Sequence, residues 1–127
     1  MKARPYEPKD FEQIQAWGKE WGANYSEDQF PQIGFIVDDV AAYFLYQTDS
    51  SVCFLENMVS NKKIHQEIKN QALTLIAEAI LKKAKEEEFT VAYATTNNVA
   101  IAKRAAEHGA KCQWGHLLLI KDLTDPS

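Results

Sequence analysis

The run VCFLENMV, residues 52–59, followed by SNKKIHQ, residues 60–66, decides the fold of this chain. The first run is rich in apolar and β-branched residues and predicts a strand. The polar run leads into a helix that reaches about residue 87, and a strand at residues 89–95 follows it. Two strands joined by a long helix form a parallel pair with a right-handed crossover.

The helix after residue 63 is predicted to be amphipathic, because its apolar residues recur at helical spacing. Its expected buried face comprises Ile64, Ile68, Leu75, Ile76, Ala79, Ile80 and Ala84. Its expected polar face comprises Lys69, Glu78, Lys82, Lys85 and Glu86. One face should therefore pack on the sheet while the other stays in water.

The flanking sequence adds helices and hairpins to this crossover. An extended start at residues 2–6 precedes a helix with apolar residues at Phe11, Ile14, Trp17 and Trp21. Ser26 begins a second helix that Pro31 cuts short. A hairpin is predicted at residues 35–47, a helix from about residue 97 to 108, and closing strands at 111–114 and 116–121. The order predicts a single α+β domain over residues 1–127 with a mixed central sheet.

The composition excludes several classes of function. The net charge of −4 and the sequence pI near 5.3 argue against binding nucleic acid through its phosphates. No apolar run is long enough for a signal peptide or a membrane span, so a cytoplasmic protein is expected. Cys53 and Cys112 lie in strand-like runs and are expected to be reduced and buried, and no Cys or His cluster predicts a metal site.

Several strings resemble the GNAT family, the Gcn5-related N-acetyltransferases. Arg4-Pro5 with Asp10 and Ile14 resembles that family's first strand and helix, residues 54–59 its fourth strand, and residues 98–109 its last helix. The resemblance covers nearly the whole chain and implies an acyl-CoA N-acyltransferase fold that binds acetyl-CoA and an amine acceptor. It also implies that backbone groups of Asn57, Met58 and Val59 pair with the pantetheine amides.

The chain departs from that family where the pyrophosphate of the cofactor should bind. No glycine occurs between Gly34 and Gly109, whereas the family uses a glycine-rich loop to bring backbone N–H groups close to the anion. Lys62, Lys63 and the helix dipole are the candidate substitutes, and the two lysines are more simply solvated charges. At two further positions the chain departs again. Ala105, or a neighbour that also has no hydroxyl, stands where the family often has a tyrosine acid, and Ala110 stands where it usually has an aromatic residue. His108 is more simply a helix-end cation than a catalytic residue.

Glu56 is the strongest candidate for a catalytic residue. It is expected to share a strand face with Val52, Phe54 and Met58, because side chains alternate along a strand. A carboxylate there is a candidate general base for the amine, and many members of the family use a Glu on this strand. The alternative is a carboxylate at the solvent edge or paired with a lysine.

The remaining polar and aromatic candidates have equally simple structural explanations. Asn98 is a candidate ligand of the cofactor or of a water molecule, but a helix cap explains it as well. His65 is expected one turn into the long helix, at the surface. Trp17, Trp21 and Tyr25 would line an acceptor pocket or, more simply, form part of the core.

Two functions follow from these observations. The first is an N-acetyltransferase that moves an acetyl or acyl group from acyl-CoA to a primary amine. The second is a binding or assembly module that keeps the fold without the chemistry, similar to small GNAT-like proteins carried by bacteriophages. The sequence does not identify the acceptor, and a homodimer is an open expectation because terminal strands of this fold class often form dimers.

Overall fold

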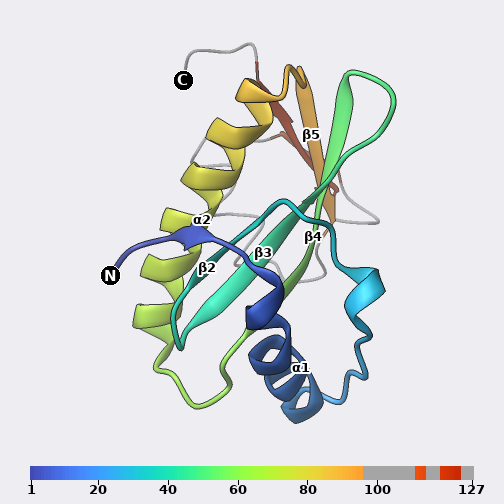
Figure 1. Ribbon diagram of the computed structural model, residues 1–127. Helices are drawn as coiled ribbons and strands as arrows, with labels where there is room; N and C mark the ends of the chain where they lie inside the picture. Colours follow the sequence, from blue (N-terminus) through green and yellow to red (C-terminus); the bar gives the residue numbers. More distant parts are fainter. Residues whose placement is uncertain (96–110, 114–117, 124–127) are drawn as a thin grey trace. The chain divides into compact units, whose positions relative to one another are not determined.

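The computed structural model describes the backbone of residues 1–95, 111–113 and 118–123 (Figure 1). Its contacts divide the chain into two compact units. The first unit comprises Met1–Leu45 with Asn57–Ile80, and the second comprises Tyr46–Glu56 with Leu81–Ser127. Strand β4 (Val52–Ser60) and helix α2 (Gln66–Glu86) each contribute residues to both units.

An antiparallel sheet forms the centre of the first unit. Strand β1 (Arg4–Pro5) pairs with β2 (Gly34–Val37), and β2 pairs with β3 (Ala41–Tyr46) in a register that runs from Gly34↔Phe44 to Val37↔Ala41. The hairpin predicted at residues 35–47 is therefore confirmed. Its turn places Asp39 at a φ of 65°, a conformation that aspartate tolerates better than most residues.

Phe44 is the centre of the aromatic core in this unit. Its side chain is fully buried, and its ring packs against Tyr6 at 4.9 Å and Phe30 at 4.7 Å between centroids. Gly34 lies directly opposite it on β2, and a Cβ at that position would come within 2.5 Å of the ring of Phe44. A glycine is required there because the aromatic ring occupies the space that a side chain would need.

Helix α1 (Phe11–Glu20) follows the short 3₁₀ turn η1 (Pro8–Asp10). Ile14 and Trp17 lie on its buried side, as their spacing predicts. Trp21 caps the helix and is 53% exposed, so its expected place in the core is wrong. The second helix shrinks to the 3₁₀ turn η2 (Glu27–Gln29), which Ser26 caps before Pro31.

Arg4 and Asp10 join β1 to the start of α1. The guanidinium of Arg4 donates from Nη1 and Nη2 to the two carboxylate oxygens of Asp10 at 2.9 and 2.7 Å. Asp10 is 7% exposed and also accepts the backbone N–H of Glu7 at 2.8 Å. The Arg4 hydrogen bonds outweigh the effect of burial and lower the pKa of Asp10.

This lowered pKa predicts an acid-sensitive contribution to stability. An unfolded aspartate has a pKa of about 3.9, so the contribution of Asp10 is complete above that pH and is lost as the pH falls through the lower folded pKa. Asp10→Asn should therefore destabilise the protein at pH 6–7, and its difference from wild type should shrink below about pH 4. Urea unfolding at several pH values measures this, and a pH-independent difference would contradict it.

The second unit contains a mixed sheet. The first half of β4 pairs with β5 (Val91–Thr95) in parallel, from Val52↔Val91 to Leu55↔Ala94. Strand β7 (Leu118–Asp122) then pairs antiparallel with both β5 and β6 (Lys111–Gln113). The predicted parallel crossover from β4 through α2 to β5 is confirmed (Figure 1). Cys53 is fully buried, as expected, and burial raises the pKa of its thiol.

Helix α2 buries a stripe that differs at its start from the predicted one. Ile76, Ile80 and Ala84 are fully buried as expected. Ile68 is 41% exposed and Lys69 is only 7% exposed, so both predictions for the first turn are wrong. The buried stripe follows the spacing 69, 72, 76, 80 and 84, and continues onto the lysine because that position lies on the same helix face. None of the described helices is long and apolar enough to cross a membrane.

Candidate functional site

Strand β4 presents one buried and one accessible face. Cys53, Leu55 and Val59 are buried, whereas Phe54 is 41% exposed and Met58 is 40% exposed. Glu56 lies on the accessible face between these two residues and is half-buried. The predicted strand face of Glu56 is therefore confirmed. Glu56 takes part in an interaction within the protein and is also partly accessible.

Among the described residues, the parallel pairing of β4 with β5 reaches the residue before Glu56. The last pair among the described residues is Leu55↔Ala94, although β5 continues to Thr95, which pairs with Leu118 of β7. In a parallel ladder the next partners would be Glu56 and Thr95, and the described part of the chain is interrupted directly after Thr95, from residue 96. Strand β4 itself continues to Ser60, so Glu56 is the first residue beyond this parallel ladder.

Asn57, the residue after Glu56, has a φ of 58° in the middle of β4. This left-handed conformation interrupts a regular strand, and asparagine adopts it more readily than most side chains. The chain thus changes its backbone direction where the pairing with β5 has ended. Asn57 also makes an interaction of its own with the rest of the protein.

The glycine-free loop after β4 is organised by Asn61. Its backbone N–H donates to the carbonyl of Val40 at 2.8 Å, and its side-chain amide donates to the carbonyl of Asp39 at 3.0 Å. Its side-chain oxygen accepts the N–H of Lys63 at 3.0 Å, which forms an Asx turn. The loop therefore holds its shape without glycine and uses the Lys63 N–H internally.

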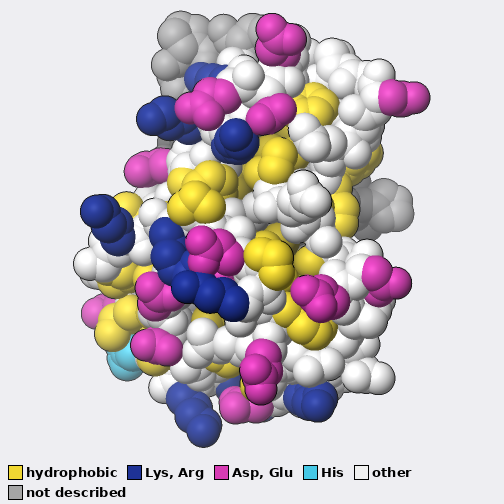
Figure 2. Space-filling model, viewed as in Figure 1, with side chains coloured by type: hydrophobic (Ala, Val, Ile, Leu, Met, Phe, Trp, Pro, Cys, Tyr) yellow, Lys and Arg dark blue, Asp and Glu magenta, His cyan; other side chains and the backbone are white. Residues whose placement is uncertain are grey.

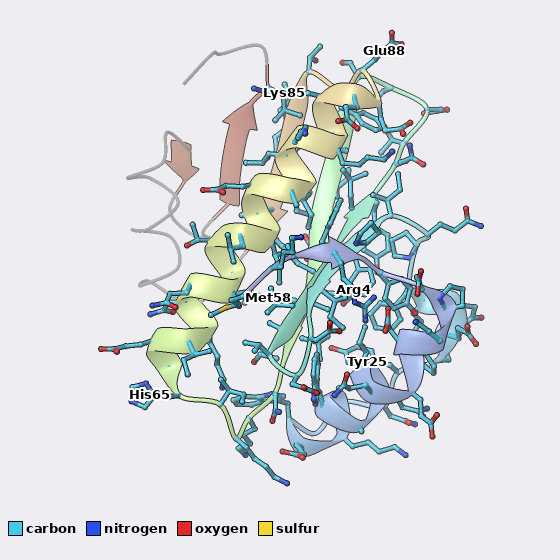
Figure 3. The ribbon with its side chains drawn as sticks, turned by 60° about the vertical axis from the view of Figure 1, so that its left-hand side comes forward. Arg4, Tyr25, Met58, His65, Lys85 and Glu88 are labelled. Carbon is cyan, nitrogen blue, oxygen red and sulfur yellow. The ribbon has the colours of Figure 1, made fainter. Side chains whose placement is uncertain are left out.

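His65 caps α2 rather than lying one turn inside it. The helix begins at Gln66, and His65 Nδ1 accepts the backbone N–H of Glu67 at 3.3 Å (Figure 3). Its carbonyl accepts the N–H of Lys69 at 3.1 Å. The prediction for His65 is wrong in position, because the cap is made by an imidazole instead of the usual Ser, Thr, Asp or Asn.

Trp21 and two lysines form a cluster beside this loop. The indole N–H of Trp21 donates to the carbonyl of Ser60 at 2.9 Å. The Nζ atoms of Lys62 and Lys69 lie 5.1 and 5.3 Å from the ring centroid of Trp21, within the range of a cation–π interaction. Lys62 also donates to the carbonyl of Glu20 at 3.5 Å. We call these three side chains the Trp21 cluster.

The two predicted phosphate ligands, Lys62 and Lys63, differ in their contacts with the Trp21 cluster. Lys62 and Lys63 are both exposed, and Lys62 belongs to the cluster. Lys69 adds a second positive charge near the head of α2, where the helix dipole is also positive. On the face shown in Figure 2, basic and acidic side chains are interspersed.

Sequence reasoning missed Lys69 and misplaced Trp21. The signal for Lys69 was present, because it lies three and seven residues before two buried residues of α2, Ala72 and Ile76. No comparable signal existed for Trp21, whose position depends on the distant Ser60 carbonyl. Asn98, Ala105, His108 and Ala110, with the helix predicted over residues 97–108 and its stop at Gly109, lie outside the described residues.

No family model matches the sequence, and no curated protein sequence matches it. Similar solved structures include Ard1 from Thermoplasma volcanium, at a TM-score of 0.69 and 11% identity, over 95% of this chain and 96% of that one. The GNAT family N-acetyltransferase YhbS from Escherichia coli, solved in complex with CoA, has a TM-score of 0.64 and 16% identity, over 95% and 80% of the two chains.

A third similar structure is a part of a larger enzyme. N-acetylglutamate synthase from Neisseria gonorrhoeae, complexed with coenzyme A and L-arginine, has a TM-score of 0.73 and 11% identity. The match covers 98% of this chain and 33% of that one. The chain therefore has the α+β fold of the GNAT N-acetyltransferases, as its element order predicts, and identities this low establish the fold alone.

Proposed function

We propose that this protein transfers an acyl group, most simply acetyl, from acyl-CoA to a primary amine. The observation that carries the proposal is the position of Glu56. It is the first residue beyond the parallel pairing of β4 with β5, on an accessible strand face, in a chain with an acetyltransferase fold. A half-buried carboxylate at such a position is suited to accept a proton from an ammonium group.

The proposed donor site begins at the next residues of β4. Backbone groups of Asn57, Met58 and Val59 would pair with the pantetheine amides, which requires no particular side chain. The left-handed Asn57 and the accessible Met58 fit this role, because the strand has left its regular course here. The residues present therefore suit the arm of the cofactor.

The phosphates of the donor would be held by charge more than by backbone groups. Lys62, Lys63 and Lys69 lie in or just after the loop that leads into α2, and the positive end of the helix dipole adds to their attraction. The N–H of Lys63 already donates to Asn61, and that of Glu67 to His65. We therefore expect weaker phosphate binding than a glycine-rich loop provides.

The proposed chemistry assigns Glu56 to the acceptor. Bound acyl-CoA would supply a thioester, in which the amine forms a C–N bond at the carbonyl carbon as the C–S bond breaks. Glu56 would take the proton of the incoming ammonium, directly or through one water, so that the nitrogen lone pair is available. The second proton of the nitrogen would leave to solvent after the C–N bond forms. The departing thiolate would take a proton from solvent, because Ala105 at the family's tyrosine position has no hydroxyl. Asn98 stays a proposed ligand of the cofactor or of a water.

Titration calorimetry with acetyl-CoA tests the donor site. Binding of acetyl-CoA is expected, and Lys62→Ala and Lys63→Ala should each weaken it about three- to tenfold, or roughly 0.7–1.4 kcal/mol. Acetyl-pantetheine lacks the nucleotide phosphates, so the same variants should leave its binding unchanged. Lys85→Ala, near the opposite end of α2 (Figure 3), serves as the control and should not affect either ligand.

The outcome also decides between the two functions. Absence of acetyl-CoA binding at millimolar concentration would contradict the transferase and favour a module that binds or assembles without catalysis. Binding together with release of free thiol in the presence of an amine would support the enzyme. The acceptor, the cytoplasmic location and a homodimer stay proposals that this experiment does not address.

A further inference from the structure

The Trp21 cluster places a largely buried lysine beneath an accessible ring. Lys69 is only 7% exposed, whereas Trp21 is 53% exposed, and the Nζ atom of Lys69 lies 5.3 Å from the centroid of the indole ring. Among the described residues, none accepts a hydrogen bond from this Nζ or pairs with it as an ion. A charge this buried is costly without an opposite charge, so Lys69 is suited to bind an anion.

The indole ring of Trp21 is held over Lys69 by contacts at the surface. Its N–H donates to the carbonyl of Ser60 at 2.9 Å. The exposed Lys62 places its Nζ 5.1 Å from the same ring centroid and donates to the carbonyl of Glu20 at 3.5 Å. Contacts of this kind contribute little when they are open to water, so the ring can leave its place at a small cost in free energy.

The backbone beside Trp21 also leaves the ring room to move. Helix α1 ends at Glu20, so Trp21 lies just beyond its last helical residue. The next residue, Gly22, has a φ of 84°, and a Cβ there would meet no atom within 4 Å. A change of the Trp21 rotamer, or of the backbone at Gly22, can therefore turn the indole outward without unfolding α1.

We propose that Trp21 is a movable cover over Lys69, which phosphate anions reach only when the indole leaves the carbonyl of Ser60. This proposal rests on the proposed function and adds a regulation of the same phosphate site. In the closed state both ammonium groups lie against the ring, and in the open state Lys62 and Lys69 face the anion near the positive end of α2. Because only the open state binds the anion through both lysines, the apparent affinity falls with the fraction of open molecules.

Titration of the full chain with inorganic pyrophosphate at constant ionic strength tests the cover. Trp21→Leu has no ring to close over Lys69, so it should bind pyrophosphate about three- to tenfold more tightly than wild type. Trp21→Phe keeps a ring but loses the N–H that binds Ser60, and a smaller gain is expected. Phe54→Leu changes an accessible aromatic residue of the second unit and should leave the affinity unchanged.

A double variant assigns the gain to the ammonium group of Lys69. Methionine keeps an unbranched side chain without the charge, so Trp21→Leu combined with Lys69→Met should bind pyrophosphate no more tightly than Lys69→Met alone. An unchanged or lowered affinity in Trp21→Leu, or a gain that persists without the Lys69 charge, would overturn the cover. Absence of pyrophosphate binding in both wild type and Trp21→Leu would overturn it as well.

Acetyl-CoA separates the failure of the cover from the failure of the proposed function. Binding of acetyl-CoA to the wild-type protein, together with an unchanged pyrophosphate affinity in Trp21→Leu, would overturn the cover and leave the proposed donor site intact. Absence of acetyl-CoA binding in both proteins would contradict the transferase, whereas the pyrophosphate titrations decide the cover in either case.

Discussion

Replacement of Glu56 by glutamine should lower kcat about 10²- to 10⁴-fold for any amine that the protein acetylates. The amide keeps the shape of the side chain but does not accept the proton of the incoming ammonium. Binding of acetyl-CoA should stay within about twofold of wild type, because the proposed donor contacts begin at Asn57. Steady-state release of free thiol measures the rate, and titration calorimetry measures the donor.

A second carboxylate, that of Asp49, provides a control that separates the loss of the Glu56 base from the loss of one negative charge. Asp49 lies in the exposed turn before β4 in the same unit, so Asp49→Asn removes one negative charge without touching the strand face. Its kcat should remain near that of wild type. A Glu56→Gln protein that keeps kcat within a few-fold of wild type would remove Glu56 from the proposed chemistry.

Replacement of Phe44 by alanine should lower the free energy of unfolding by about 3–5 kcal/mol, the largest change in stability expected for this chain. The fully buried ring packs between Tyr6 and Phe30 and faces Gly34 across the hairpin. Because Gly34 has no side chain, the neighbouring strand has few atoms that could move into the cavity left by the removed ring. Urea unfolding followed by circular dichroism measures the change.

The same substitution at an accessible ring provides the comparison. Phe54→Ala removes an equal number of atoms from a residue that is 41% exposed, so its destabilisation should stay below about 1.5 kcal/mol. Equal losses for the two variants would show that the packing of Phe44 contributes less than its burial indicates. Comparison of the two variants also shows how much the side chain of Phe54 contributes to the stability of the fold.

Much of the fold was predictable because it depends on periodicity. Alternation along residues 52–59 and helical spacing at Ile76, Ile80 and Ala84 identified the two main elements of the crossover. Helix α2 begins later than predicted, because Asn61 holds the preceding residues in a turn and His65 makes the cap. Such side-chain caps are local contacts that a hydrophobic pattern does not reveal.

The candidate site was predictable only in part. The face of β4 that carries Glu56 followed from strand alternation, but the end of the β4–β5 pairing at Leu55↔Ala94 depends on both strands and on β7. Lys62 was expected to be a solvated charge or a phosphate contact, and in the structure its Nζ lies over the ring of Trp21. Its partner in the cluster, Lys69, was assigned to the solvent face because charged residues are rarely buried.

The local pattern of apolar and polar residues thus determined which segments are strands and helices, and which strand face carries Glu56. Tertiary structure decided what those side chains meet, because the contacts join residues far apart in sequence. Trp21 binds the carbonyl of Ser60, and Phe54 packs on Tyr93. Neither contact leaves a periodic signal, since each depends on how segments separated by some forty residues come together in space.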